Sequence, residues 1–433
     1  MAESLLFEKI MIVNEDFNCE GPLYLGVDGG KIDYISETAP EKVYDRRLDG
    51  KNKVLLPALV NTHTHLPMTL LRGYAENYSL SDWLNKKVFP FEAKLTGDDI
   101  YYGMLLAQAE MFRFGTVSTT EMYFRLSQLC RATAESGAKI NVCNPILCFG
   151  STDFENFSET KEYLELLQDK SLTADGRIIV DMGIHGEYTS NPVAVEKAAD
   201  FAKEHGMRIQ LHLSETKSEH EECKQRHGLT PAAYFEKHGA FDVPCTAAHC
   251  VWLEDEDMEI LARKGVTVAN NPISNLKLAS GIANVKKMME KGINVALGTD
   301  GVASNNNLNL FEELKLFAVL NKAASGDPAF VTPAQALKAA TLNGARSQGR
   351  DNCGLIKLGA AADLAVIDTD KPYMHPCHDL MANLVYSAQG TDVVMTVCDG
   401  RVLYENGEYK TVDVERAVYE VEKSAYKYAN ELK

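Results

Sequence analysis

The stretch LPALVNTHTH, residues 56–65, has the pattern of a buried strand that ends in two histidines. Its apolar and β-branched residues predict a strand, and side chains two residues apart on a strand point to the same side. His63 and His65 can therefore reach one point. Two buried imidazoles need polar partners, and a single metal ion would satisfy both. We predict that this stretch opens a parallel barrel and supplies two ligands of a metal site.

Seven more short apolar stretches follow, and the sequence between them is helical in character. For example, TPAQ at residues 332–335 is a capping box with proline at the first helical position. Eight alternating β/α units predict an α/β protein with a (β/α)8 TIM-like barrel, whose catalytic groups lie at the carboxyl ends of the strands. The candidate strands are Ala58–His65, Thr116–Thr120, Ile140–Leu147, Ile178–His185, Arg208–Leu213, Cys245–His249, Val266–Ala269 and Asn294–Gly298.

The two ends of the chain have a different pattern. Residues 1–56 contain short β-branched runs separated by turn signals, and Asp363–Ile367 and Val393–Cys398 have the same character near the other end. Segments of this kind can pair into one sheet. We therefore expect residues 1–56 and 355–433 to form a small β-sandwich domain, and residues 57–354 to form the barrel.

Further candidate site residues stand where other predicted strands end. His212 ends the fifth strand, and Glu215 follows it in QLHLSE, residues 210–215. We interpret His212 as a third metal ligand and Glu215 as a proton donor and acceptor, although Glu215 could instead cap the next helix. His249 ends the sixth strand, where its flanking residues are small and apolar, so its ring needs a buried partner such as the attacking water.

Asp300 ends the eighth strand, in LGTDG at residues 297–301. A carboxylate there can contact the metal and accept a proton from its water, although Asp-Gly is also a common turn signature. Three histidines and one aspartate suit one divalent ion, Zn²⁺ first and Fe²⁺ or Mn²⁺ as alternatives. Such an ion lowers the pKa of water to about 7, which suits attack on a flat carbon that bears an amine or amide. Four other histidines follow charged helical sequence and are predicted to be solvated: His205, His220, His227 and His238.

Composition excludes several classes of protein. The formal net charge of −17 argues against nucleic-acid binding, and no apolar stretch approaches the roughly 20 residues of a membrane span. The first residues lack the basic and apolar regions of a secretory signal. The ten cysteines show no pairing pattern and predict buried, reduced thiols. These features together predict a cytoplasmic protein.

The set of site residues resembles that of the amidohydrolase superfamily, and the resemblance covers essentially the whole chain. GLIKLG at 354–359 and LPALVN at 56–61 are similar to the family's passages between barrel and β-domain. Two-metal members carry a lysine at the end of strand four, but Arg177–His185 contains none. The chain therefore resembles the one-metal deaminases, in which the strand-six histidine, here His249, orients the attacking oxygen and is not a metal ligand.

The closer resemblance is to the methylthioadenosine/S-adenosylhomocysteine deaminase family. It rests on three stretches: LHLSET at 211–216, NPISNLKLASG at 271–281 and TDGVASNN at 299–306. The resemblance implies that Trp83 lies over a purine, that Glu92 accepts hydrogen bonds from the ribose hydroxyls and that His185 and Glu215 also contact the substrate. Simple packing and a surface charge are the alternatives for Trp83 and Glu92.

The resemblance implies deamination of an adenosine-type nucleoside, with Asp300 accepting the proton of the water, Glu215 protonating the purine and a homo-oligomer as the family's usual state. One feature departs from the family: no arginine lies between Arg131 and Arg177 to meet the carboxylate of S-adenosylhomocysteine. A less charged 5′ group therefore fits better: adenosine, 5′-deoxyadenosine or methylthioadenosine. Deamination of guanine or cytosine and triazine hydrolysis remain alternatives, hydrolysis of a cyclic amide is disfavoured by the missing lysine, and a metal-free binding scaffold is a remote alternative.

Overall fold

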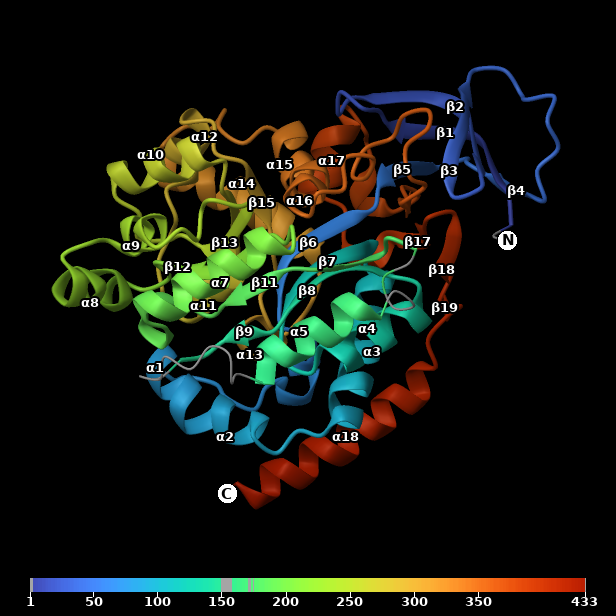
Figure 1. The fold of residues 1–433 in the computed structure, drawn as a ribbon. Helices are drawn as coiled ribbons and strands as arrows, with labels where there is room; N and C mark the ends of the chain where they lie inside the picture. The colour runs from blue at the N-terminus through green and yellow to red at the C-terminus, as the bar shows by residue number, and fades with distance from the viewer. Residues whose placement is uncertain (1–2, 149–157, 170–172, 174, 433) are drawn as a thin grey trace.

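A computed structural model describes residues 3–148, 158–169, 173 and 175–432 of the chain. The fold is α/β: parallel strands lie at the centre, helices surround them, and a mixed sheet lies at one side of the molecule (Figure 1). The parallel strands, the helices between them and the mixed sheet agree with the α/β class that the sequence predicts.

The central strands form two parallel sheets. The four-stranded sheet has the order β10 (Ile178–Val180), β8 (Lys139–Cys143), β7 (Thr116–Met122) and β6 (Leu59–Thr64). The six-stranded sheet has the order β15 (Val295–Leu297), β14 (Thr267–Asn270), β13 (Cys245–His249), β12 (Ile209–Leu213), β11 (Met182–Ile184) and β9 (Pro145–Ile146). Most of these strands are buried along their whole length, as expected for parallel strands covered by helices.

Backbone hydrogen bonds join the two parallel sheets at two places. The Asp300 amide, just after β15, donates to the carbonyl of His63 in β6 at 3.0 Å. The Asp181 amide, between β10 and β11, donates to the Val142 carbonyl at 2.9 Å. The third and fourth predicted strands are each divided in two, by Asn144 and Asp181, so eight predicted strands correspond to ten short ones.

Helices follow most of the central strands, and several begin where the sequence places a cap. Thr96 caps α3 (Gly97–Arg113) and Thr332 caps α15 (Pro333–Ala340), both in capping boxes. The remaining helices of this part are η1 (Leu66–Leu71), α1 (Leu80–Trp83), η2 (Leu84–Val88), α2 (Phe89–Glu92), α4 (Leu126–Ser136), α5 (Ser158–Gln168), η4 (Glu187–Thr189), α7 (Pro192–Glu204), α8 (Lys217–His227), α9 (Pro231–Lys237), α10 (Asp255–Lys264), α11 (Pro272–Lys277), α12 (Val285–Glu290), α13 (Val302–Asn305), α14 (Leu310–Ser325) and α16 (Leu342–Ser347).

Both ends of the chain share the mixed sheet, as the sequence predicts. Its order is β19 (Glu408–Tyr409), β18 (Arg401–Glu405), β17 (Val393–Cys398), β16 (Leu364–Asp368), β5 (Lys53–Pro57), β1 (Leu5–Val13), β2 (Cys19–Asp28) and β3 (Lys31–Ser36), and β4 (Arg46–Asp49) pairs with β1. Strands β5 and β16 pair antiparallel, with Pro57 opposite Leu364. The sheet has a hydrophobic core of its own, which contains Leu25, Leu55 and Val397.

The C-terminal segment also contains helices: η5 (Pro372–Met374), α17 (Leu380–Tyr386), η6 (Gly390–Asp392) and α18 (Val414–Glu431). Helix α18 crosses the outside of the molecule and packs on α3 (Figure 1). The Tyr428 hydroxyl donates to Asp99 at 3.0 Å. The segment after residue 355 thus contacts both the mixed sheet and the helices around the parallel strands.

Other sequence expectations can be compared with the structure. All ten cysteines lie in the described part of the chain, none forms a disulfide there, and eight are buried.

Of the four histidines predicted to be solvated, the prediction is wrong for His220, which is 3% exposed and lies between Ser214 and Glu254. The charged residues next to His220 in sequence suggest an exposed position, but His220 lies on the face of α8 that is buried. Among the described helices, none has both the length and the apolar character that crossing a bilayer requires.

Candidate metal centre and active site

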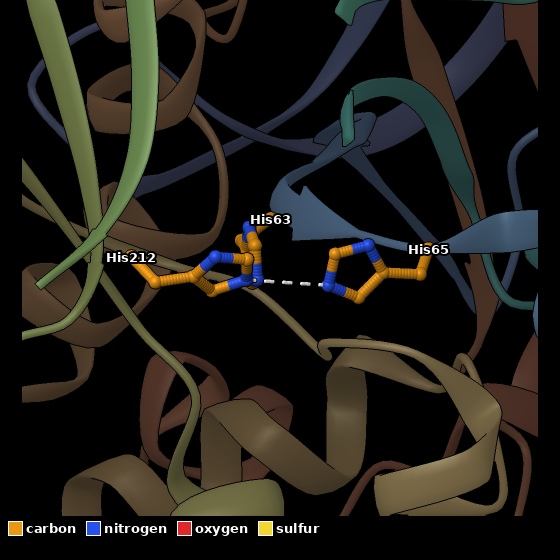
Figure 2. A group of neighbouring side chains, drawn as sticks. All are labelled: His63, His65 and His212. Carbon is orange, nitrogen blue, oxygen red and sulfur yellow. Dashed lines mark hydrogen bonds between the residues drawn. The ribbon is translucent and has the colours of Figure 1, made fainter. Parts of the chain in front are cut away.

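Three histidines meet at the carboxyl ends of two strands that are far apart in sequence. His63 and His65 come from β6 and the residue after it, and His212 comes from β12. Their rings point toward one another (Figure 2), and their ligand nitrogens lie within 4.8 Å of one another. The Nε2 atoms of His65 and His212 are 3.4 Å apart. This clustering agrees with the spacing argument from the sequence.

Backbone carbonyl groups hold the Nδ1 atoms of two of these rings, on the side away from the cluster. His65 Nδ1 donates to the Met122 carbonyl and His212 Nδ1 to the His185 carbonyl, each at 2.6 Å. These bonds leave Nε2 of both rings without a proton and aimed at the centre, the arrangement that metal-ligating histidines usually have. Burial lowers the pKa of His65, and burial together with the other imidazoles lowers the pKa of His63 and His212 well below the usual value.

Neutral imidazole is the form that binds a metal ion. His63 Nε2 is buried and has no hydrogen-bond partner among the described residues. An unpartnered nitrogen that faces two other ring nitrogens and a carboxylate is difficult to explain as packing. The donor set therefore fits a divalent metal ion.

Asp300 supplies the carboxylate of this centre. Its Oδ1 lies 3.3 Å from His65 Nε2 and 3.6 Å from His63 Nε2. Its Oδ2 accepts hydrogen bonds from the hydroxyls of Ser274 at 2.6 Å and Ser304 at 2.8 Å. Burial alone would raise the pKa of Asp300, but His65, His249 and the hydrogen bonds from Ser274 and the Gly301 amide outweigh it and lower the pKa. Asp300 is therefore a carboxylate that both contacts the ligand cluster and can accept a proton.

Glu215 and His249 lie beside the ligand cluster. The Ser280 hydroxyl donates to Glu215 Oε1 at 3.0 Å, and Glu215 Oε2 is 3.7 Å from His249 Nε2. Burial raises the pKa of Glu215, which favours a form that carries a proton to donate. Burial opposes charge on His249, but Glu215 and Asp300 outweigh it and raise the pKa of the imidazole.

A cavity of about 90 Å³ joins these groups to the predicted substrate residues. Trp83, Glu92 and His185 line it together with His65, His212 and Asp300, and His63 is not among its lining residues. Burial raises the pKa of Glu92 to about 7 and lowers that of His185 to about 3, so His185 is neutral. His185 Nδ1 is 3.0 Å from the Thr189 hydroxyl oxygen. All nine predicted site residues are thus brought to one place.

A second cavity of about 450 Å³ adjoins the first, since Leu80, Leu84 and Tyr188 line both. Its polar lining consists of hydroxyl, amide and carboxylate side chains, and no lysine or arginine is among the described residues that line it. Part of the interval without arginine, at residues 149–157, lies outside the described chain.

Sequence reasoning missed the residues that orient the site. Asn275 accepts from His249 Nδ1 at 2.8 Å, while Ser274 and Ser280 hold Asp300 and Glu215. All three lie in NPISNLKLASG, a stretch that the family resemblance singles out without giving roles to its members. Glu219 accepts from the backbone amides of Ser214 and Glu215, and the Thr216-to-Glu219 capping box is a signal that could have identified it.

The chain is similar to known proteins over nearly its whole length. The amidohydrolase family model matches residues 54–403. A 5-methylthioadenosine/S-adenosylhomocysteine deaminase of Dictyoglomus thermophilum is 47% identical over 395 residues, covering 91% of this chain and 92% of the relative. A 5′-deoxyadenosine deaminase of Methanosarcina acetivorans is 42% identical over 405 residues, 92% of each chain. An adenosine deaminase structure from Xanthomonas campestris with bound zinc has a TM-score of 0.91 and 30% identity, covering 98% of both chains.

Proposed function

Because the chain belongs to the amidohydrolase family, we propose that it is a metal-dependent hydrolytic deaminase that converts adenosine-type nucleosides to the inosine analogue and ammonia. The observation that carries this proposal is the convergence of three histidine nitrogens and the Asp300 carboxylate beside Glu215 and His249. An acid, a base and a metal-binding set at one cavity are what hydrolysis of an aromatic amine needs.

We assign His63, His65, His212 and Asp300 to one divalent ion, most simply Zn²⁺, in each chain. The nitrogen-rich donor set suits Zn²⁺, and the zinc-bound adenosine deaminase is similar over almost all of this chain. When bound, the ion supplies Lewis acidity that lowers the pKa of water to about 7. Fe²⁺ and Mn²⁺ accept similar donors.

The protein's own groups would then move the protons. Asp300 accepts a proton from the attacking water, and the two serines on Oδ2 keep its carboxylate oriented. Glu215 delivers a proton to the ring nitrogen beside C6, while His249 hydrogen-bonds the attacking oxygen. As the C6–N bond breaks, Asp300 returns its proton to the departing amine, which leaves as ammonia. The C6 hydroxyl gives up its proton as the carbonyl forms, and this proton restores protonated Glu215.

Substrate selection follows from the two cavities. Trp83, Glu92 and His185 would hold the purine and ribose in the inner cavity, and the 5′ group would extend into the outer one. The described outer lining offers no cation for a carboxylate. We therefore propose adenosine, 5′-deoxyadenosine or methylthioadenosine as preferred substrates, ahead of S-adenosylhomocysteine.

The proposal extends to the architecture of the chain. We propose that residues 57–354 form a (β/α)8 barrel and that residues 1–56 and 355–433 form the small β-domain of sandwich type. The strand order and the hydrogen bonds that join the two parallel sheets support the barrel. The separate core of the mixed sheet supports the second domain.

Ammonia release from a panel of substrates, with metal content measured on the same sample, tests the function. The panel holds adenosine, 5′-deoxyadenosine, methylthioadenosine, S-adenosylhomocysteine, guanine and cytosine. We expect turnover of the uncharged nucleosides and about one metal per chain. Turnover of the free bases alone would overturn the nucleoside assignment, and absence of metal would favour a binding scaffold.

Replacing Glu92 with alanine tests the ribose assignment. A buried polar group that pairs with a substrate hydroxyl is a strong source of discrimination, so the change is expected to lower kcat/KM for adenosine by roughly 100-fold or more. Turnover of adenine, which has no ribose, should change far less. Equal losses for nucleoside and free base would remove Glu92 from ribose binding.

A further inference from the structure

Two polar atoms in the wall of the inner cavity have no hydrogen-bond partner in the described chain. They are Nε1 of Trp83 and the hydroxyl oxygen of Tyr123, on side chains that are 5% and 3% exposed, and the acceptor beside the Tyr123 hydroxyl is the Glu92 carboxyl group, with which it makes no bond of ordinary geometry. Most buried polar groups in native proteins are paired, so an unpaired one in a cavity wall indicates a ligand that pairs with it. The substrate contacts proposed above include Trp83 but give no role to Tyr123.

Tyr123 is held in one position. It directly follows β7, and its backbone amide donates to the Cys143 carbonyl at 2.9 Å. Its ring stacks on Phe124 at a centroid distance of 4.3 Å and an interplanar angle of 22°. The ring centroid of His65 is 6.5 Å away. The Tyr123 ring is therefore held next to the histidine cluster, and its side chain is buried.

The Tyr123 hydroxyl lies beside the carboxyl group of Glu92. Both groups line the inner cavity. A phenol keeps its proton at neutral pH, so the Tyr123 hydroxyl can donate a hydrogen bond. Burial raises the pKa of Glu92, whereas the Tyr123 hydroxyl lowers it. The cavity thus holds a permanent donor next to an acceptor.

A ribose has two neighbouring hydroxyls, and each can donate one hydrogen bond and accept others. A carboxylate only accepts, so Glu92 can satisfy the hydroxyl protons but not the oxygen lone pairs. A buried diol that met Glu92 alone would leave acceptor atoms unpaired. The missing partner is a fixed O–H or N–H donor near the carboxylate.

We propose that Tyr123 is a second ribose-binding residue, whose hydroxyl donates to a ribose oxygen while Glu92 accepts from the diol. This inference rests on the proposed nucleoside substrate. It makes Tyr123 a specificity residue that distinguishes ribonucleosides from their deoxy counterparts, and it gives a role to the buried tyrosine hydroxyl beside Glu92.

The Tyr123→Phe variant removes one oxygen and keeps the ring stacked. Steady-state deamination is measured with adenosine, 2′-deoxyadenosine and 3′-deoxyadenosine. We expect kcat/KM for adenosine to fall roughly tenfold, the usual effect of one lost hydrogen bond, mainly through KM. For the deoxynucleoside that lacks the contacted hydroxyl, the loss should be less than about threefold, because no oxygen remains to bind.

Tyr101→Phe is the matched control, because its hydroxyl bonds Glu135 on outer helices, away from the cavity. It is expected to behave as the unmodified protein. An unchanged Tyr123→Phe variant, or equal losses on all three nucleosides, would overturn the role of Tyr123 and leave the deaminase proposal intact. If the unmodified protein deaminates none of the nucleosides, both proposals fail together.

Discussion

At the scale of single residues, the site is built where the backbone is constrained. Ser214, His249 and Asp300 have φ of 46°, 70° and 62°, in the left-handed region that residues other than glycine rarely adopt. Such strain persists only where the surroundings impose it, and it is common at functional sites. Here Glu215, which follows Ser214, and His249 and Asp300 themselves line the cavity, so the ends of the predicted strands were enough to select from sequence the residues that meet there.

Glu215 carries the clearest prediction at this scale. Burial raises the pKa of its carboxyl group, which prepares it to give and take a proton. Glu215→Gln keeps the shape but cannot transfer a proton, so kcat is expected to fall by at least about 100-fold. Metal content should stay unchanged, as measured by elemental analysis beside ammonia release. Glu256→Gln on the exposed face of α10 is the control, and a near-normal rate for Glu215→Gln would exclude proton transfer by this residue.

At the scale of elements, the start of α8 determines how Glu215 is presented. Glu219 is 6% exposed, and its carboxylate accepts from the amides of Ser214 at 2.9 Å and Glu215 at 2.7 Å. One capping residue therefore fixes the turn between β12 and α8. The sequence allows a helix cap as an alternative role for Glu215, whereas the structure gives the cap to Thr216 and Glu219.

Glu219→Gln tests this arrangement. The amide replaces an acceptor with a donor that faces backbone N–H groups, so the turn should loosen and cost about 1–3 kcal/mol of stability. We expect kcat to fall roughly tenfold with KM and metal content nearly constant, because Glu219 acts through Glu215. Glu221→Gln lies on the exposed side of the same helix and should change neither quantity. A normal kcat in Glu219→Gln would show that Glu215 is held by Ser280 alone.

The third and fourth predicted strands are each interrupted in the structure, and the sequence does not predict these interruptions. Apolar runs predict continuous strands over Ile140–Leu147 and Ile178–His185. In the structure the Tyr163 hydroxyl binds both the amide and the carbonyl of Asn144 at 2.7 Å and interrupts the first of them. Asp181 interrupts the second, where its carboxylate accepts from Asn141 and Gln210. Both causes are contacts between distant segments, which local periodicity cannot reveal.

At the scale of the whole molecule, one buried lysine joins the parallel strands to the C-terminal segment. Lys139 in β8 lies 2.6 Å from Asp363 and 2.7 Å from Asp399, and the Lys139 and Asp363 side chains are each 4% exposed. The strand-like runs at the two chain ends predict a shared sheet but not this ion cluster, because the partners of Lys139 are more than 200 residues away in sequence.

Lys139→Met is expected to destabilise the protein strongly. It leaves two carboxylates near one another without a cation, and breaking a buried pair costs about 3–5 kcal/mol. Urea unfolding measures the change. Lys86→Met removes an exposed pair with Asp82 and should cost less than about 1 kcal/mol. Similar losses in both variants would mean that the buried cluster contributes no more than a surface pair.

The pairing of β5 with β16 has a consequence for the growing chain on the ribosome. One edge of β5 stays unpaired until β16 is made, about 300 residues later in the chain. At ordinary rates of synthesis this delay lasts roughly 15 to 60 s. Throughout that interval an apolar strand presents unpaired backbone groups, a template for association with other chains. The edge of β5 is therefore covered only when synthesis reaches the last sixth of the chain, unless a chaperone binds it in the meantime.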